Sequence, residues 1–171
     1  RRGARRSAVG FTPVSISATA TPAPASAGAQ GPATKASNAA ACAAEIRGTA
    51  KTTAEEAVRG ADLVCTVTNA SQPVLKGAWL KPGAFVAAVG AVRPTWRELD
   101  DEAMRNVVVA DSREAAAQES GDVILSRAPV YAEIGELLAG SVPMPRAGAT
   151  VVFKALGQAV ADAVAARLVY E

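Results

Sequence analysis

Three segments of the chain are continuous runs of apolar residues, many of them β-branched. They cover 62–68 (DLVCTVT), 84–89 (AFVAAV) and 106–110 (NVVVA). A strand with one face in water alternates apolar and polar side chains, whereas a parallel strand that is covered on both faces is apolar throughout. The pattern therefore predicts parallel strands that are buried on both faces.

Predicted helices lie between and after these runs. Thr53 is followed three residues later by Glu56, a capping box that predicts a short helix ending at Gly60. The other predicted elements are helices over 34–47, 112–118 and 131–138 (the last closed by Gly140), a short strand over 150–153 and a long helix over 156–170. This alternation of strands and helices predicts an α/β fold with a parallel sheet.

The long C-terminal helix carries an apolar stripe. Leu156, Val160, Val164 and Leu168 follow one another at intervals of four residues, so they share one face of the helix. A stripe of this kind needs a partner surface. We expect it to be exposed in this chain and to drive self-association.

The N-terminal part of the chain has a different composition. Residues 15–32 are mostly Ala, Ser, Thr, Pro and Gly, and they hold too few large apolar side chains to offset the entropy of ordering. We therefore expect residues 1–33 to be a disordered, low-complexity segment. The segment is arginine-rich and free of acidic residues, as in a transit peptide for a plastid or mitochondrion, and the alternative is a fragment that begins at Arg1.

The composition excludes several kinds of site. Because the sequence has no histidine, it cannot build a Ser-His-Asp triad, a Cys-His pair or an ordinary catalytic zinc site. Two cysteines are too few for a disulfide framework. All acidic residues follow residue 44, so the main body is mildly acidic and is not expected to bind nucleic acid. No apolar run reaches the length of a membrane span.

Two further features have ordinary explanations. Cys65 lies in the middle of an apolar run, so we expect a buried, unreactive thiol. Glu98, Asp100, Asp101 and Glu102 are acidic, but their place before a helical segment favours a solvated helix start that complements the helix dipole. We therefore predict no metal site.

The loops after the predicted strands are the candidate ligand site. Open parallel sheets bind ligands at the carboxyl ends of their strands, here residues 66–69, 90–94 and 153–155. Thr and Asn in these loops can hydrogen-bond a ribose or an amide, and Gly90 permits close approach of the backbone, although the same residues are common in ordinary turns. No two glycines are separated by a single residue, so the Gly-x-Gly-x-x-Gly dinucleotide fingerprint is absent.

Several motifs, taken in order, resemble the ornithine cyclodeaminase/mu-crystallin family, and the resemblance is strongest to its ketimine reductase branch. It covers residues 34–170. The motifs are ADLVCTVT (61–68), WLKPGA (79–84), AVGAVRPTWRELDD (88–101), ESGDV (119–123), EIGE (133–136) and VFKALG (152–157).

The resemblance implies a homodimer whose subunits each have a Rossmann-type NAD(P) domain and a second domain for substrate and dimerisation. The motifs match neither the N-terminal half of the family nor the first strand, glycine loop and helix of its nucleotide domain. The implied fold is therefore an incomplete Rossmann-type domain over 34–150, followed over 151–171 by a strand and a helix that would return to a missing substrate and dimerisation domain. We expect this chain to bind dinucleotide weakly or not at all.

The resemblance also implies site residues. Thr34 matches a threonine that meets the adenosine ribose and the 2′-phosphate, with Ser37 or Asn38 at a neighbouring polar contact. Pro32 and Ala33 replace an Asn and an Arg there, so the Arg–phosphate contact that selects NADPH is lost. The other implied cofactor residues are Thr66, Val67, Thr68, Val89, Gly90 and Ala155, and Glu119 is implied at the substrate or ligand site.

Residue 92 separates two activities within the family. Ornithine cyclodeaminases carry an aspartate there as acid and base, whereas this chain has Val92, which cannot move a proton. The resemblance thus implies a cytoplasmic enzyme that reduces cyclic ketimine carboxylates with NADH or NADPH, with activity reduced in this chain and no catalytic side chain assigned. The alternatives are an ornithine cyclodeaminase and a non-enzymatic protein that binds a thyroid-hormone-like ligand.

Overall fold

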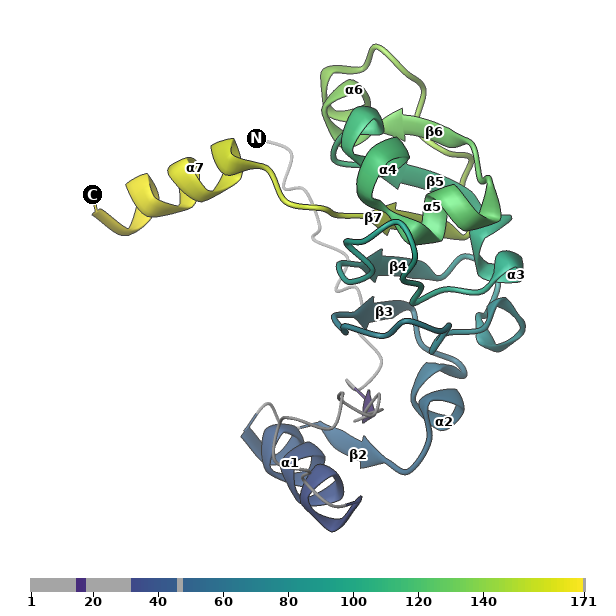
Figure 1. The fold of residues 1–171 in the computed structure, drawn as a ribbon, viewed down its shortest axis with the longest axis vertical. Helices are drawn as coiled ribbons and strands as arrows, with labels where there is room; N and C mark the ends of the chain where they lie inside the picture. The colour runs from purple at the N-terminus through teal and green to yellow at the C-terminus, as the bar shows by residue number, and fades with distance from the viewer. Residues whose placement is uncertain (1–14, 18–31, 46–47, 171) are drawn as a thin grey trace, which may run out of the picture.

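The computed structural model describes residues 15–17, 32–45 and 48–170. Its centre is a five-stranded sheet in which every neighbouring pair of strands is parallel (Figure 1). The strands in spatial order are β3 (Leu63–Thr66), β4 (Phe85–Ala88), β7 (Val151–Lys154), β5 (Val107–Ala110) and β6 (Val130–Glu133). The predicted α/β class with a parallel sheet is confirmed, and each of the three apolar runs contains one strand.

Two strands differ from the expected organisation. β7, expected in a separate segment that begins at residue 151, lies between β4 and β5 and is the central strand. β6 occupies the start of the helix predicted over 131–138, and that helix, α6 (Ile134–Ala139), begins only after the strand ends. β6 is an edge strand that pairs with β5, a long-range constraint that no local pattern reveals.

Short helices begin at polar residues that cap them. The side chains of Thr53, Asp100, Ser112 and Ser120 each accept a hydrogen bond from a backbone N–H in the first helical turn. Figure 1 shows α3, α4 and α5 in front of one face of the sheet. The short helices of this part of the chain are α2 (Ala54–Val58), the 3-10 turn η1 (Gly77–Trp79), α3 (Asp101–Met104), α4 (Arg113–Glu119) and α5 (Gly121–Ser126).

The main core lies between the sheet and these helices. Buried side chains from four strands, β3, β4, β5 and β7, point into it, together with residues from the connecting loops and helices. Its large members are Val64, Val86, Val108, Val152, Leu75, Leu99 and Met104. A smaller cluster on the opposite face brings together Val109, Ala132 and Leu137, so α6 covers that face only near β5 and β6.

The prediction of strands buried on both faces is wrong for β3 and β4. Burial alternates along both strands, and Leu63 and Phe85 keep 55% and 41% of their surface exposed. Cys65 lies on this uncovered face and is exposed, so the expectation of a buried thiol is also wrong. The apolar runs are suited to a covered sheet, but within the described residues the cover reaches only one face of these two strands.

A smaller parallel unit precedes the main sheet. β1 (Ser15–Ser17) pairs with β2 (Thr49–Lys51), and α1 (Pro32–Glu45) connects them and packs against both. β1 lies within the segment expected to be disordered, so the expectation does not hold for these three residues, nor for Pro32 and Ala33 at the start of α1. The rest of residues 1–33 lies outside the described residues.

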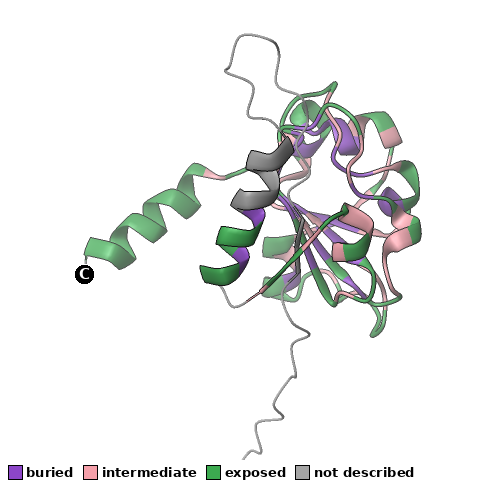
Figure 2. Ribbon diagram, turned by 90° about the horizontal axis from the view of Figure 1, so that it is seen from below, coloured by how far each residue is buried: buried purple, intermediate pink, exposed green. Residues whose placement is uncertain are grey.

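The C-terminal helix α7 (Ala159–Tyr170) has no buried residue. Figures 1 and 2 show it extending away from the sheet, with its whole length coloured as exposed in Figure 2. It begins later than predicted because the N–H groups of Leu156 and Gly157 donate to Oδ2 of Asp111, each at 2.8 Å, and Gly157 adopts a φ of +93°. The expected exposure of the apolar stripe is confirmed for Val160, Val164 and Leu168. It is wrong for Leu156, which precedes the helix, is partly buried and packs against the main core. No described helix is long and apolar enough to cross a membrane.

An ion pair connects α4 and α6 near β6, the edge strand of the sheet. Arg113, the first residue of α4, donates through both terminal nitrogens to Glu136 of α6, at 2.8 and 2.6 Å. The Glu133 N–H also donates to Glu136, at 2.8 Å, and the Arg113 N–H donates to Glu133. These hydrogen bonds, those from Arg113 above all, hold the pKa of Glu136 below its ordinary value.

Adding charge to the apolar stripe of α7 should reduce self-association. Val160 and Val164 are exposed, and burying each side chain would contribute about 1.5–3 kcal/mol of favourable free energy. Self-association can supply that burial. We expect the wild-type chain to associate at tens of micromolar and the double variant V160E/V164E to sediment as a smaller species with an unchanged melting temperature. The variant A159E/A166E adds two carboxylates on the opposite side of the helix and should associate like the wild type. A monomeric wild-type chain would refute this prediction.

The Arg113–Glu136 pair should make stability depend on pH in the acidic range. A carboxyl whose pKa is lowered on folding binds fewer protons in the folded state, so its stabilisation is present above its ordinary pKa of 4.5 and is lost as the pH falls below that value. In urea unfolding from neutral pH to pH values below 4.5, we expect the difference in unfolding free energy between wild type and Glu136→Gln to shrink with acidification.

Two features of this experiment make it specific. The pKa of Asp122 is raised and so has the opposite pH trend, but this contribution is common to wild type and variant and cancels in the difference. Glu114→Gln removes an exposed carboxylate from the same helix, leaves the Arg113–Glu136 pair intact and is the matched control. A constant difference for Glu136→Gln would contradict the assigned role of the pair.

Candidate functional site

The carboxyl ends of the five strands meet at one edge of the sheet, where the sequence predicts the ligand site. The loops at this edge follow Thr66 of β3, Ala88 of β4 and Lys154 of β7. Backbone hydrogen bonds continue past the strands: the Val89 N–H donates to Thr66 O at 2.8 Å, and the Ala155 N–H donates to Ala88 O at 3.0 Å. The three loops are therefore held side by side.

The carboxylate of Glu98 joins the first two loops. It is completely buried. Its Oε2 accepts hydrogen bonds from Oγ1 of Thr66 at 2.8 Å and from the Gly90 N–H at 2.9 Å. Its Oε1 accepts from the Thr68 N–H at 2.5 Å. A single side chain from later in the connection between β4 and α3 thus fixes the ends of β3 and β4 relative to each other.

Two more charged side chains complete this network, and both are completely buried. Lys154 donates through Nζ to the carbonyl oxygen of Gly90 and pairs with Oδ2 of Asp122 at 3.2 Å. Oδ1 of Asp122 accepts from the N–H groups of Glu98 and Leu99, at 2.8 and 3.0 Å. Each buried charge therefore has several partners, which offset the cost of removing it from water.

The pKa of Asp122 shows the balance of these effects. Burial raises the pKa of this carboxyl above its ordinary value. The backbone hydrogen bond from Leu99 and the positive charge of Lys154 oppose part of that rise, because both favour the ionised form. At this carboxyl, desolvation therefore outweighs the hydrogen bonds and the pairing with Lys154.

The expected solvated helix start is wrong for Glu98 and holds for the three acidic residues after it. Asp100 accepts from the Ala103 N–H at 2.8 Å and caps α3, while Asp101 and Glu102 are exposed on the first turn. Glu98 precedes the cap by two residues, so its side chain does not share the solvent face of the helix. The described residues contain no group of three or more His, Cys, Asp or Glu that could hold a metal ion.

The predicted residues of the first two loops do lie together, but they divide into two kinds. Thr66 and Gly90 are buried, and a Cβ on Gly90 would overlap Thr68 O and the Glu98 carboxylate. Thr68 is partly buried, and its Oγ1 accepts from the Ala70 N–H at 3.1 Å. Val67 and Val89 instead present 68% and 39% of their surface to solvent. The first kind holds the loops in place, and the second forms an apolar surface.

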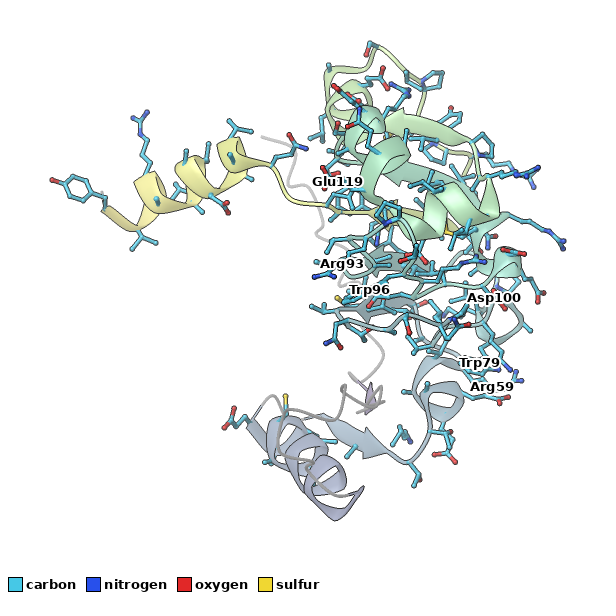
Figure 3. The ribbon with its side chains drawn as sticks, in the orientation of Figure 1. Arg59, Trp79, Arg93, Trp96, Asp100 and Glu119 are labelled. Atoms are coloured by element: carbon cyan, nitrogen blue, oxygen red, sulfur yellow. The ribbon has the colours of Figure 1, made fainter. Side chains whose placement is uncertain are left out.

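The remaining predicted site residues have different surroundings. Ala155 lies beside the end of β4 through its backbone hydrogen bond. Figure 3 shows Glu119 at the same edge as Arg93 and Trp96, and Glu119 is exposed. The structure places Thr34, Ser37 and Asn38 in α1, beside β1 and β2 and apart from the five-stranded sheet in Figure 1. Their side chains lie outside the described residues.

The surface at this edge suits a flat, uncharged ring. Val67, Val89 and Val92 are exposed, and the guanidinium of Arg93 is stacked over the Trp96 ring at 4.6 Å from its centroid. Ala91 has a φ of +53°, unusual for a residue other than glycine, and its carbonyl accepts from the Gly121 N–H. In the loops after β3 and β4, no exposed side chain is suited to accept or donate a proton at neutral pH.

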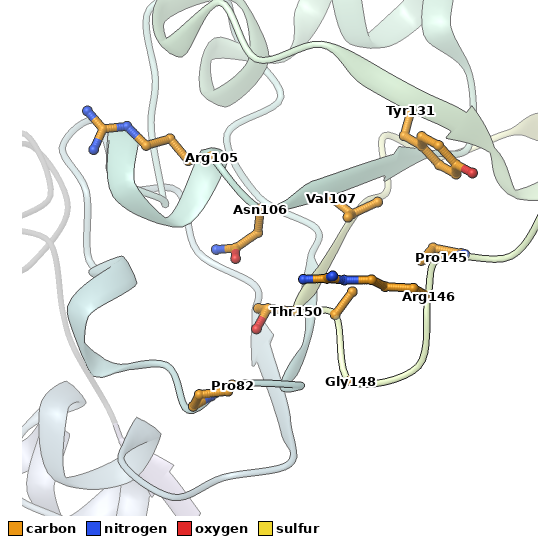
Figure 4. Close-up of a pocket in the computed structure, with 10 residues that line it drawn as sticks. Pro82, Arg105, Asn106, Val107, Tyr131, Pro145, Arg146, Gly148 and Thr150 are labelled. Carbon is orange, nitrogen blue, oxygen red and sulfur yellow. The ribbon is translucent and has the colours of Figure 1, made fainter.

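Two hollows lie elsewhere on the molecule. The first, shown in Figure 4, is lined by Asn106, Val107, Tyr131, Arg146 and Thr150 among others, at the amino ends of the strands. The second lies on the uncovered face of the sheet and is lined mainly by apolar side chains, including Phe85, Val109, Leu137, Val151 and Phe153. Neither hollow contains a predicted site residue. The carboxyl edge remains the candidate site because the buried network and the loops meet there.

Known proteins resemble this chain in sequence. Ketimine reductase mu-crystallin from Macropus fuliginosus is 61% identical over 118 residues, which are 68% of this chain and 37% of that protein. Delta(1)-pyrroline-2-carboxylate reductase from Bacillus cereus is 38% identical over 130 residues, covering 70% of this chain and 40% of the relative. The chain therefore spans less than half the length of these relatives.

Solved structures resemble its fold. Thermococcus litoralis Delta(1)-pyrroline-2-carboxylate reductase in complex with NADH and L-proline has a TM-score of 0.71 at 30% identity, over 82% of this chain and 47% of that one. An archaeal alanine dehydrogenase dimer with bound NAD has a TM-score of 0.69 at 27% identity, over 81% of this chain and 46% of that one. The sheet thus resembles that of two proteins solved with NADH or NAD, and the sequence match over residues 28–171 shows that the chain belongs to the ornithine cyclodeaminase/mu-crystallin family.

Proposed function

We propose that this chain supplies the nicotinamide side of an enzyme that reduces cyclic ketimine carboxylates with NADH or NADPH. The observation that carries the proposal is the fixed pair of loops after β3 and β4, in a chain whose relatives include ketimine and pyrroline-2-carboxylate reductases. The solved relative from Thermococcus litoralis contains NADH and L-proline, the saturated counterpart of such an imine.

The residues at the carboxyl edge fit a nicotinamide cofactor. Gly90 packs directly against Thr68 O and the Glu98 carboxylate, where a Cβ would overlap them, and its backbone N–H and carbonyl are fixed by Glu98 and Lys154. Val67 and Val89 offer exposed apolar surface for one face of the ring. When bound, the cofactor supplies the hydride, and the protein supplies orientation and a suitable electrostatic environment.

In this proposal the chain's own residues orient the reactants. Thr66, Thr68 and Gly90 keep the two loops at a constant separation, while Val67 and Val89 exclude water from one side of the ring. Thr34, Ser37 and Asn38 are the proposed contacts at the adenosine end, Ala155 is proposed beside the nicotinamide, and Glu119 is proposed near the substrate. We assign residues 34–154 to the nucleotide-binding domain and 155–171 to a segment that packs against another domain.

Val92 argues against the cyclodeaminase alternative. It is 46% exposed at the candidate edge, where an aspartate could exchange a proton with a bound substrate and a valine cannot. Reduction of a C=N bond needs a hydride delivered to carbon by the cofactor and a proton taken up by nitrogen from water, and neither requires a carboxylate at this position. We further propose a cytoplasmic homodimer, and we keep binding of a thyroid-hormone-like ligand without turnover as the second candidate.

The test is a comparison of substrates, made with a purified full-length version of the protein. We expect NADH or NADPH to be oxidised when Delta(1)-pyrroline-2-carboxylate is added, with proline as the product. Ornithine should give neither proline nor ammonia. Loss of reduced-nicotinamide absorbance measures the first reaction, and amino-acid chromatography measures both. Conversion of ornithine without oxidation of NADH or NADPH would contradict the proposal, and ligand binding with no turnover would favour the second candidate.

A further inference from the structure

The Glu98 carboxylate is fully buried, and its hydrogen bonds account for both oxygens. Oε1 receives the Thr68 N–H, and Oε2 receives the Gly90 N–H and the Thr66 hydroxyl. Glu98 therefore has no exposed surface with which to meet substrate or cofactor. Its partners, however, all lie in the two loops proposed to hold the nicotinamide.

The same carboxylate also determines what those loops offer to a ligand. Because the N–H groups of Thr68 and Gly90 donate inward to Glu98, neither is available to a bound molecule. The outer surface is left to apolar side chains such as Val67 and Val89. An anionic group would find no backbone donor from these two residues, whereas an uncharged ring needs none.

Asp122 and Lys154 fix the positions of Glu98 and Gly90. Asp122 receives the N–H groups of Glu98 and Leu99, which fixes the backbone on which the Glu98 side chain is carried. Lys154 donates to the Gly90 carbonyl, so Gly90 is held through both of its backbone polar groups. The position of the second loop thus depends on charges from three separate segments of the chain.

We propose that Glu98 is a positioning residue for the nicotinamide end of the cofactor site, acting by holding the loops after β3 and β4 together with their N–H groups turned inward. This inference rests on the proposed function. It predicts that binding of the nicotinamide end of the cofactor depends on Glu98. Binding of the adenosine end, which is proposed to lie at α1, does not depend on it.

The substitution Glu98→Gln tests the inference because it preserves shape and changes one acceptor into a donor. Both carboxylate oxygens face a backbone N–H, so the amide nitrogen must lie against either Thr68 or Gly90 in either orientation. One loop must then shift. Glu102→Gln makes the same chemical change on the exposed first turn of α3 and is the matched control.

The readout is the affinity for NADH relative to that for ADP-ribose, which lacks the nicotinamide ring. We expect Glu98→Gln to weaken NADH binding about tenfold or more while ADP-ribose binding stays within about twofold of wild type. Glu102→Gln should leave both unchanged. Equal weakening of both ligands would indicate a general structural role and would overturn the inference, as would unchanged binding of both.

If the Glu98→Gln variant does not fold, a second variant provides the test. Thr66→Val removes one hydroxyl donor to Glu98 and preserves the side-chain shape, so it should lower the same affinity ratio by a smaller factor. An unchanged ratio in Thr66→Val would then overturn the inference. Turnover of Delta(1)-pyrroline-2-carboxylate by the wild-type preparation separates the two proposals. Turnover with an unchanged ratio refutes only the role of Glu98, whereas no turnover refutes the proposed function.

Discussion

A buried network of three charges organises the carboxyl edge of the sheet. Glu98, Asp122 and Lys154 come from three segments, and their hydrogen bonds connect the ends of β3, β4 and β7. Removing one partner from a buried pair of this kind costs about 3–5 kcal/mol, because the remaining charges lose their compensation. The network is thus favourable only when all its members are present, and this makes the geometry of the loops well defined.

Local sequence patterns predict the strands of this protein better than its site. Apolar runs reveal β3, β4 and β5 because a buried parallel strand has a distinctive composition. The role of Glu98 does not follow from its neighbours, since a glutamate two residues before a capped helix resembles any solvated acid. Its burial depends on Thr66, which lies 32 residues earlier in the sequence, and on how the connection between β4 and α3 folds back to bring Gly90 against it. Thr66, Thr68 and Gly90 could be predicted through family resemblance, but only the structure divides them from Val67 and Val89.

The uncovered surfaces follow from the same sequence features. β3 and β4 have the composition of strands covered on two faces, yet Leu63 and Phe85 are exposed on one of them. The helix α7 has an apolar stripe and no buried residue. Both features are typical of a polypeptide whose apolar surfaces are larger than its own helices can cover, and the match covers only 37% of the mu-crystallin relative and 47% of the solved reductase.

The central claim is that the carboxyl edge, between the loops after β3 and β4, holds the nicotinamide. A crystal structure of the protein with NADH tests this most directly. The account predicts density for the nicotinamide ring against Val67 and Val89, with the Gly90 backbone beside it and the Glu98 hydrogen bonds intact. A ring bound in the hollow at the amino ends of the strands, or on the uncovered face near Phe85, would contradict the account.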